Sequence, residues 1–147
     1  MIKIICVGRI KEAFYRDAIG EYLKRLSKYH KVEIIEVADS NIKNEKELIL
    51  KKVDKKDYII TMEIEGRENT SIEFSNLIDK TLINNSNITF IIGGSDGLDD
   101  EVKAISNYKL SFSKMTFPHQ LFRVILLEQI YRAFKIMNNE SYHKLNT

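Results

Sequence analysis

The stretch Ile88-Thr89-Phe90-Ile91-Ile92, followed by Gly93-Gly94-Ser95-Asp96-Gly97, decides the fold of this chain. Its apolar residues do not alternate with charged ones, which is typical of a strand buried on both faces of a parallel sheet. Glycines at the carboxyl end of such a strand leave the backbone open to a ligand, although a tight connection to a helix explains them equally well. The run predicts a parallel sheet with a candidate ligand-binding loop late in the chain.

Strand and helix patterns alternate from this stretch to both ends of the chain. Runs rich in β-branched residues predict further strands at 2–7, 31–37, 58–62 and 108–111. Apolar residues at helical spacing predict helices at 12–29, 45–53, 70–83 and 118–137, with a short helix from residue 99 and a loop at 64–69. Such alternation predicts an α/β fold with a largely parallel sheet, and the length predicts a single domain over 1–147.

Two of the helix starts carry the spacing of a capping box, Asn44 with Glu47 and Thr70 with Glu73. The last helix opens at Pro118 and is apolar around most of its circumference. A helix of that kind is buried on more than one side, whereas a small open sheet covers only one of them. We therefore expect a homodimer that packs through this helix, with a central core helix in a monomer as the alternative.

The chain carries 23 basic and 21 acidic residues, a net charge of +2. That balance makes no electrostatic case for nucleic-acid binding, but it leaves room for a local basic patch. The one cysteine, Cys6, excludes an internal disulfide, and its apolar surroundings predict a small buried hydrophobe. No segment approaches the length of a membrane span, and Lys3 interrupts the short apolar N-terminal run, so we expect a cytoplasmic protein.

Three further groups of residues are candidates for binding or catalysis. The segment from Ser111 to His119 alternates hydroxyl and apolar side chains, which suits either an adenine-binding slot or a stapled helix entry. Glu128 and Arg132 stand four residues apart on the apolar helix, which fits an ion pair or, for Arg132, a contact to a phosphate or a base edge. His30 is expected at the surface, and no metal is expected because no histidines, cysteines and carboxylates have the spacing of a metal site.

Basic residues gather in the first helical region: Arg9, Lys11, Arg16, Lys24, Arg25 and Lys28. A solvated helix face is the simpler explanation of this cluster. Phosphate contacts are the alternative, since such contacts position a nucleic acid without reading its sequence.

Four motifs together resemble a known family. In chain order they are Ile91-Ile92-Gly93-Gly94, Leu110-Ser111-Phe112-Ser113-Lys114-Met115-Thr116-Phe117-Pro118-His119, Glu128-Gln129-Ile130-Tyr131-Arg132-Ala133 and Tyr142-His143-Lys144. This order is similar to that of the ribosomal RNA large subunit methyltransferase H family, which belongs to the SPOUT methyltransferases. The resemblance covers essentially the whole chain.

The resemblance implies an α/β trefoil-knot fold, with a mostly parallel sheet flanked by helices, and a homodimer. It implies that S-adenosylmethionine donates a methyl group to N3 of a pseudouridine in large-subunit (23S) ribosomal RNA, on the assembled ribosome. The donor-binding positions it implies are Met62, Gly93, Phe112, Ser113, Lys114, Met115, Thr116 and Phe117. The substrate and catalytic positions it implies are Arg132, Tyr142 and His143.

N3 of pseudouridine carries a proton at neutral pH, which must leave before or during attack. We expect His143 to accept this proton directly or through water, since histidine titrates nearest neutrality. Arg132 is expected to stabilise negative charge on the uracil carbonyls, and Tyr142 to contact the base. The alternatives are a SPOUT methyltransferase that acts on another RNA, such as transfer RNA, and a non-catalytic dimeric nucleotide-binding module.

Overall fold

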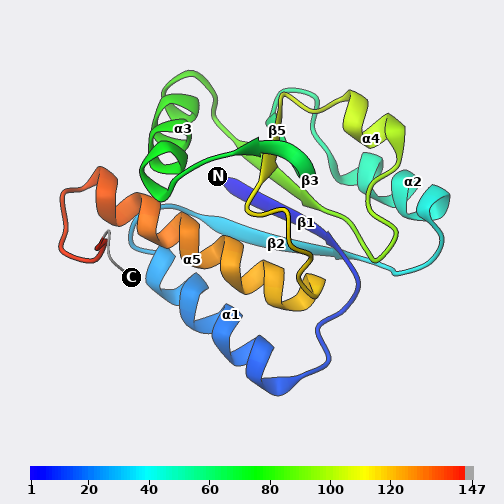
Figure 1. Ribbon diagram of the computed structural model, residues 1–147, viewed down its shortest axis with the longest axis horizontal. Coiled ribbons are helices and arrows are strands. Elements are labelled where there is room, and N and C mark those ends of the chain that lie inside the picture. Colours follow the sequence, from blue (N-terminus) through cyan, green and yellow to red (C-terminus); the bar gives the residue numbers. More distant parts are fainter. Residues whose placement is uncertain (145–147) are drawn as a thin grey trace.

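The computed structural model describes residues 1–144 and shows a five-stranded sheet between two layers of helices (Figure 1). The strands are β1 (Ile2–Val7), β2 (Val32–Val37), β3 (Tyr58–Glu68), β4 (Ile88–Ile92) and β5 (Tyr108–Ser111). The helices are α1 (Ala13–Leu26), α2 (Ile42–Lys52), α3 (Ser71–Asn84), α4 (Asp100–Ala104) and α5 (His119–Met137). The strand order is β2-β1-β4-β3-β5, and every neighbouring pair is parallel. The predicted α/β fold with a parallel sheet is confirmed.

β4 lies in the middle of the sheet and is buried along its whole length. Ile88, Phe90 and Ile92 face the core that α1, α3 and α5 share with the sheet. Ile91 points to the opposite face and packs in the second core, beneath α2 and α4. The prediction of a strand covered on both faces is therefore confirmed. The predicted single domain over 1–147 includes residues 145–147, which lie outside the described residues.

Cys6 on β1 belongs to the first of these cores and is fully buried. Burial raises the pKa of its thiol to about 12, so the side chain stays protonated and apolar near neutral pH. The interpretation of Cys6 as a small buried hydrophobe is confirmed.

α5 packs between α1 and α3 on one face of the sheet (Figure 1). Leu126, Leu127 and Ile130 point into the core. On other sides of the helix, Val124 and Ile125 are only partly covered. The helix is thus apolar beyond the side that the sheet covers, as its sequence predicts, whereas the homodimer inferred from this pattern stays a prediction.

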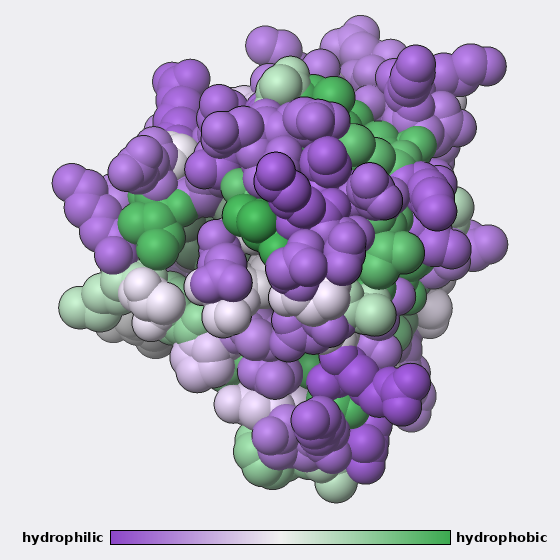
Figure 2. Space-filling view, turned by 90° about the vertical axis from the view of Figure 1, so that its right-hand side faces the viewer, coloured by the Kyte–Doolittle hydropathy of each residue, from purple (hydrophilic) through white to green (hydrophobic). Residues whose placement is uncertain are grey.

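Hydrophilic side chains cover most of the face that looks to the right in Figure 1, as Figure 2 shows. Apolar side chains appear there only in small separate areas. The face has the composition expected of a surface in contact with water.

Helix ends depart from the prediction where local hydrogen bonds decide them. α2 begins at Ile42, because Asn41 is its cap and accepts a hydrogen bond from the backbone N–H of Asn44 at 2.9 Å. The predicted capping box of Asn44 and Glu47 is therefore wrong. The box of Thr70 and Glu73 at the start of α3 is confirmed, with both of its hydrogen bonds present.

α1 is shorter than the predicted helix at 12–29. It ends at Leu26, whose carbonyl oxygen accepts hydrogen bonds from the backbone N–H groups of both Tyr29 and His30 in a closing turn. This turn brings the ring of His30 onto Phe134 of α5, with ring centroids 5.6 Å apart. The expected surface position of His30 is wrong, because the turn folds the imidazole back onto the core.

β3 continues to Glu68, so the predicted loop at 64–69 is wrong. Its pairing with β5 shifts between Met62 and Arg67, and residues 63–66 bulge out of the ladder. Gly66 then passes against the backbone of β5, where an added Cβ would lie 2.8 Å from the carbonyl carbon and oxygen of Lys109. The two strands can cross this closely only because residue 66 has no side chain.

Arg123, near the start of α5, is fully buried and joins three parts of the chain. Its Nη2 donates to the carbonyl oxygens of Val7 (2.9 Å) and Gly8 (2.7 Å), and its Nη1 pairs with the carboxylate of Glu36 at 2.7 Å. A buried guanidinium is costly unless it is paired in this way. Arg123 thereby fixes the start of α5 against the ends of β1 and β2.

Replacing Gly66 with Ala is expected to lower the free energy of unfolding, because the new methyl group forces the backbones of β3 and β5 apart. Gly20 is the matched control: it lies in α1 with open space around it, so Gly20→Ala should stabilise the protein by roughly 0.5–1 kcal/mol. Urea denaturation of both variants measures the contrast. Equal stability of the two variants would show that the strands do not cross this closely.

Arg123→Met is expected to lower the free energy of unfolding by about 3 kcal/mol, because it removes the ion-pair partner of Glu36 and leaves two backbone carbonyls without their donor. Arg9→Met, an exposed position on the loop after β1, should change stability by less than about 0.5 kcal/mol. Chemical denaturation of both variants measures the two free energies of unfolding. A stability loss no greater than that of Arg9→Met would contradict the role of Arg123.

Candidate functional site

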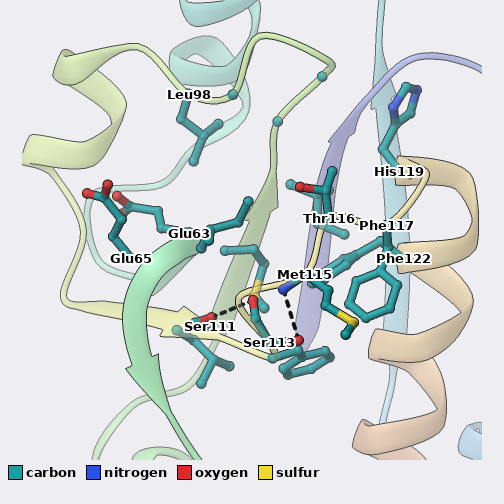
Figure 3. A pocket seen from close by; sticks show the side chains of 18 of the residues that line it. Glu63, Glu65, Leu98, Ser111, Ser113, Met115, Thr116, Phe117, His119 and Phe122 are labelled. Atoms are coloured by element: carbon teal, nitrogen blue, oxygen red, sulfur yellow. Dashed lines mark hydrogen bonds between the residues drawn. The ribbon is translucent and has the colours of Figure 1, made fainter.

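A cavity of about 820 Å³ opens at the carboxyl ends of β4 and β5. Three segments line it: the bulged part of β3, the glycine loop after β4, and the chain from Leu110 to His119 that leads into α5. Figure 3 shows Leu98, Glu63 and Glu65 on one side and Thr116 and Phe117 on the other. The carboxyl end of a parallel sheet is where open α/β folds bind ligands, so this cavity is the first candidate site.

The glycine loop forms one wall of the cavity with bare backbone. The backbone N–H of Gly97 donates to the carbonyl oxygen of Gly94 at 3.0 Å, which closes the loop into a turn. A Cβ on Gly93 would lie 2.7 Å from the carbonyl oxygen of Gly97, so no side chain fits there. The turn therefore presents main-chain groups directly to whatever fills the cavity.

The opposite wall is the segment between β5 and α5, which short hydrogen bonds hold in shape. The hydroxyl of Ser111 donates to the carbonyl oxygen of Ser113 at 3.0 Å, and the hydroxyl of Ser113 accepts from the backbone N–H of Met115 at 3.0 Å (Figure 3). Phe112 stacks on Phe122 of α5, with ring centroids 5.3 Å apart. The wall is thus a rigid apolar slot with exposed backbone groups.

Seven of the eight predicted donor-binding residues line this cavity: Met62, Gly93, Phe112, Ser113, Met115, Thr116 and Phe117. Lys114 is exposed and is not among the lining residues. Sequence reasoning missed Glu63, Ile64 and Glu65, which enter the lining because β3 bulges there. Their position depends on pairing between distant strands, and the only local sign of it is Gly66.

The three predicted catalytic residues meet Glu128 in a second cluster, at the other end of α5. Glu128 accepts hydrogen bonds from Arg132 Nε (3.2 Å) and Nη2 (3.1 Å) and from the hydroxyl of Tyr142 (2.7 Å). Arg132 Nη1 lies 3.1 Å from Nδ1 of His143, and the Arg132 guanidinium stands 4.7 Å from the centre of the Tyr142 ring. The expected ion pair of Glu128 and Arg132 is confirmed, and it holds both tail residues.

The tail that carries Tyr142 and His143 folds back onto α5 and is fastened upstream. Glu140 accepts hydrogen bonds from the hydroxyl of Tyr29 (2.9 Å) and from Lys135 Nζ (3.0 Å). The Tyr142 ring meets Tyr131 edge to face, with centroids 5.0 Å apart. Burial, with the hydrogen bond and charge of Glu128, raises the pKa of Tyr142 to about 12, so its hydroxyl is protonated near neutral pH.

The cavity and the second cluster lie apart in the chain. His119 lines the cavity at the start of α5, and Arg132 stands on the same helix about 20 Å further along its axis at about 1.5 Å of rise per residue. Within residues 1–144, no group of three or more His, Cys, Asp or Glu side chains could hold a metal ion. None of the helices in that range is both long and apolar enough to cross a membrane.

Comparisons with known proteins connect this arrangement to named relatives. The family described as "Predicted SPOUT methyltransferase" matches residues 1–143. The ribosomal RNA large subunit methyltransferase H of Clostridium botulinum (strain Kyoto / Type A2) is 55% identical over 157 aligned residues, which cover 97% of this chain and 99% of that protein. A protein of Methanococcus maripaludis (strain C5 / ATCC BAA-1333) is 53% identical over the same shares of both chains.

Two solved structures share the fold at low sequence identity. A probable methylase family protein from Haemophilus influenzae Rd KW20 aligns with a TM-score of 0.60 and 16% identity, over 97% of this chain and 70% of that one. The tRNA (m1G37) methyltransferase from Aquifex aeolicus aligns with a TM-score of 0.52 and 15% identity, over 89% and 69% of the two chains. The match of the family to nearly every described residue, together with relatives above half identity, shows that the chain belongs to the SPOUT methyltransferase family.

Proposed function

We propose that this protein transfers a methyl group from S-adenosylmethionine to N3 of a pseudouridine in large-subunit ribosomal RNA. The observation that carries the proposal is the 55% identity, along almost the whole chain, to a protein named for this ribosomal RNA. The structural neighbour named for transfer RNA is only 15% identical, so its likeness concerns the fold and does not favour that substrate. A ribosomal substrate would place the reaction in the cytoplasm.

The cavity beside Gly93 suits S-adenosylmethionine in size and character. Its volume of about 820 Å³ lies within the usual range for ligand pockets. Leu98 and Phe117 supply apolar side chains from opposite walls and the glycine loop supplies bare backbone, a combination that matches an adenine ring with polar edges. Glu63 and Glu65 at the rim complement the positive charge of the donor. When bound, S-adenosylmethionine supplies an electrophilic methyl group.

We assign the RNA side of the site to Arg132, Tyr142 and His143. The Arg132 guanidinium can stabilise the negative charge that develops on the uracil carbonyls when N3 loses its proton. The rest of its contribution is positioning, since methyl transfer needs the nucleophile in line with the methyl group. In the folded-back tail, His143 holds one edge of this guanidinium and Tyr142 lies against its face.

A homodimer is part of the proposal, because the two halves of the site lie at opposite ends of α5. The partly covered apolar side chains of α5, among them Val124 and Ile125, provide a surface for a second copy. A dimer through this helix would bring the cluster of one protomer to the cavity of the other. The trefoil knot implied by the family resemblance also stays a prediction, which the fold likeness to other methyltransferases supports.

The RNA backbone has a candidate contact surface on and beside α1. The exposed basic residues there are Arg9, Lys11, Arg16, Lys24, Arg25 and Lys28. Arg25 also lies over the ring of Tyr131, 5.7 Å from its centre, so the basic surface adjoins the cluster of Arg132. This continuity favours phosphate contacts over a face that only meets solvent, and it supports a substrate as large as the assembled ribosome.

The direct test combines binding and product mapping. Calorimetry should show uptake of S-adenosylmethionine, and incubation with ribosomes that lack the modification should place one methyl group on N3 of a pseudouridine in the large subunit. Free transfer RNA is the matched control and should stay unmethylated. Donor binding without any RNA product would point to a nucleotide-binding module, and methylated transfer RNA would point to another substrate.

Substitutions in the two halves should separate donor binding from methyl transfer. Gly93→Ala should abolish uptake of S-adenosylmethionine, because the new Cβ collides with the glycine loop. Arg132→Ala should keep donor binding and lose at least about 100-fold in turnover, the usual scale for losing one electrostatic contact to the transition state. Calorimetry and the ribosome assay measure the two effects, with Gly20→Ala as the control that should change neither.

Mixed dimers of these two variants should regain activity. A heterodimer has one intact cavity, from the Arg132→Ala subunit, facing one intact cluster, from the Gly93→Ala subunit. The ribosome assay after subunit exchange measures the recovery. No recovery, with exchange verified by mass, would refute a site shared between subunits.

A further inference from the structure

If the proposed function holds, the N3 proton needs an acceptor. Four polar groups near the C-terminal end of α5 are the candidates. The imide must lose this proton to become a nucleophile, so an acceptor has to lie within reach. Glu128, Arg132, Tyr142 and His143 are the polar side chains in contact with one another there. The functional group of each side chain determines whether it can donate or accept a hydrogen bond here.

His143 is not an open acceptor in this arrangement. A guanidinium only donates hydrogen bonds, so the contact at 3.1 Å makes Nδ1 of His143 the acceptor for Arg132. The proton of a neutral imidazole then sits on Nε2, which is buried and has no partner among the described residues. With Nδ1 engaged by Arg132 and Nε2 carrying the hydrogen, neither nitrogen offers a free lone pair to the imide N–H of the substrate.

Glu128 is the only anion in the cluster, and it can only accept. One of its oxygens, Oε1, receives the Tyr142 hydroxyl at 2.7 Å and Arg132 Nη2 at 3.1 Å, while Oε2 receives Arg132 Nε at 3.2 Å. The side chains of Glu128 and Arg132 are each 20% exposed, so the pair is screened from water but still accessible. A carboxylate held on both oxygens in a partly dry site is a fixed proton acceptor rather than a mobile surface charge.

The hydroxyl of Tyr142 can link the Glu128 carboxylate to a bound substrate. This hydroxyl donates its hydrogen to Glu128, and the oxygen has two lone pairs, so beside the neighbouring Tyr22 hydroxyl one lone pair remains for a donor such as an imide N–H. The titratable and charged groups that face it are Tyr22 and Arg25 from α1, Glu128, Tyr131 and Arg132 from α5, and His143 from the tail. The raised pKa of Tyr142 agrees with a hydroxyl that keeps its proton until a stronger acceptor takes it.

We propose that Glu128 takes up the N3 proton through Tyr142, as a positioning residue that acts through the tyrosine. The imide proton moves from N3 to the hydroxyl oxygen of Tyr142 while the tyrosine's own proton moves to Oε1 of Glu128. N3 forms its bond to the methyl carbon as the carbon–sulfur bond breaks, and the electron pair of that bond stays on sulfur. Glu128 ends protonated and returns the proton to water. Arg132 faces the imide with its positive charge and is held in place by the same carboxylate.

Single-turnover methylation of undermodified ribosomes, at saturating donor and across about pH 6 to 9, tests the relay. Glu128→Gln keeps the shape but cannot take a proton, so its rate near neutral pH should fall by at least about 100-fold. That rate should climb with pH more steeply than the wild-type rate, because water must then remove the imide proton. Tyr142→Phe should behave alike, and the double variant should be no slower than either single variant.

A competing variant and a control keep the experiment specific. His143→Gln can still accept a hydrogen bond from Arg132, so whatever its effect on the rate, the pH dependence of the rate should stay that of the wild type. Glu101 on α4 is another paired carboxylate, 3.2 Å from Nζ of Lys46, and serves as the control. Glu101→Gln should change neither the methylation rate nor its pH dependence. Donor affinity, from calorimetry, should be the same in every variant.

A readout without turnover follows the ionisation of Tyr142 itself. In protein with isotope-labelled tyrosine rings, the NMR signal lost in Tyr142→Phe identifies this residue. Its pKa should lie near 12 in the wild type and should fall in Glu128→Gln, because the carboxylate that disfavours the phenolate has gone. An unchanged titration in Glu128→Gln would overturn the coupling on which the relay depends.

The outcomes separate the relay from the proposed function. The relay would be refuted if Glu128→Gln kept the wild-type rate and pH profile. It would also be refuted if the rate losses of the single variants multiplied in the double variant. In both cases the proposed function would stand as long as the wild type methylates the ribosome. A loss with recovery at high pH in His143→Gln, and not in Glu128→Gln, would give the proton to His143. Absence of methylation by the wild type would refute the proposed function, and the Tyr142 titration would still decide whether Glu128 and Tyr142 are coupled.

Discussion

The burial of β4 on both faces is the constraint on which the rest of the molecule depends. A strand whose residues are all buried lies in the middle of a sheet with helices above and below it. Parallel neighbours on both sides then bring the carboxyl ends of β3, β4 and β5 to one edge. The glycines after Ile92 therefore open into a place where three separate segments converge, and the cavity is a consequence of the order of the strands.

Two of the charged side chains set into this apolar framework are arginines of α5. Arg123 is buried against the ends of β1 and β2 and serves the architecture. Arg132 is only partly covered and is held by a carboxylate that also holds the tail. The same residue type has different surroundings: Arg123 donates to two backbone carbonyls and to Glu36, whereas Arg132 donates to Glu128 and contacts His143 of the tail.

Most strands can be predicted from the sequence because their pattern is local. The ends of β1, β4 and β5 follow from runs of branched apolar residues closed by turn residues. The second half of β3 cannot be predicted in this way, because Glu63, Glu65 and Glu68 break the apolar pattern and only the pairing with β5 makes the segment a strand. The start of α2 is mispredicted because Asn44 and Asn41 are the same residue type three positions apart, and only the hydrogen bond from the Asn44 N–H to the Asn41 side chain shows that Asn41 is the cap.

In the candidate site, too, the residues with a local sequence pattern could be predicted and those that depend on distant contacts could not. Gly93 and the segment from Phe112 to Phe117 are visible in the sequence, since glycines after a buried strand and a run of hydroxyl and apolar residues are both local features. The partners of Arg123 are not, because Val7 lies 116 residues away and a buried guanidinium bonded to backbone leaves no pattern. The hydrogen bond of Tyr142 to Glu128 likewise requires the tail to turn back, which the sequence does not specify.

α5 carries residues of both the cavity and the cluster around Glu128, and this restricts how the chain can vary. A single residue inserted between His119 and Arg132 would rotate everything beyond it by about 100° and shift it by about 1.5 Å. Arg132 would then leave the side on which it meets the tail, although every side chain of the site would still be present. The spacing between His119 and Arg132 along α5 is therefore constrained, whereas exposed loops away from the cavity, such as the connection between α2 and β3, tolerate insertions more readily.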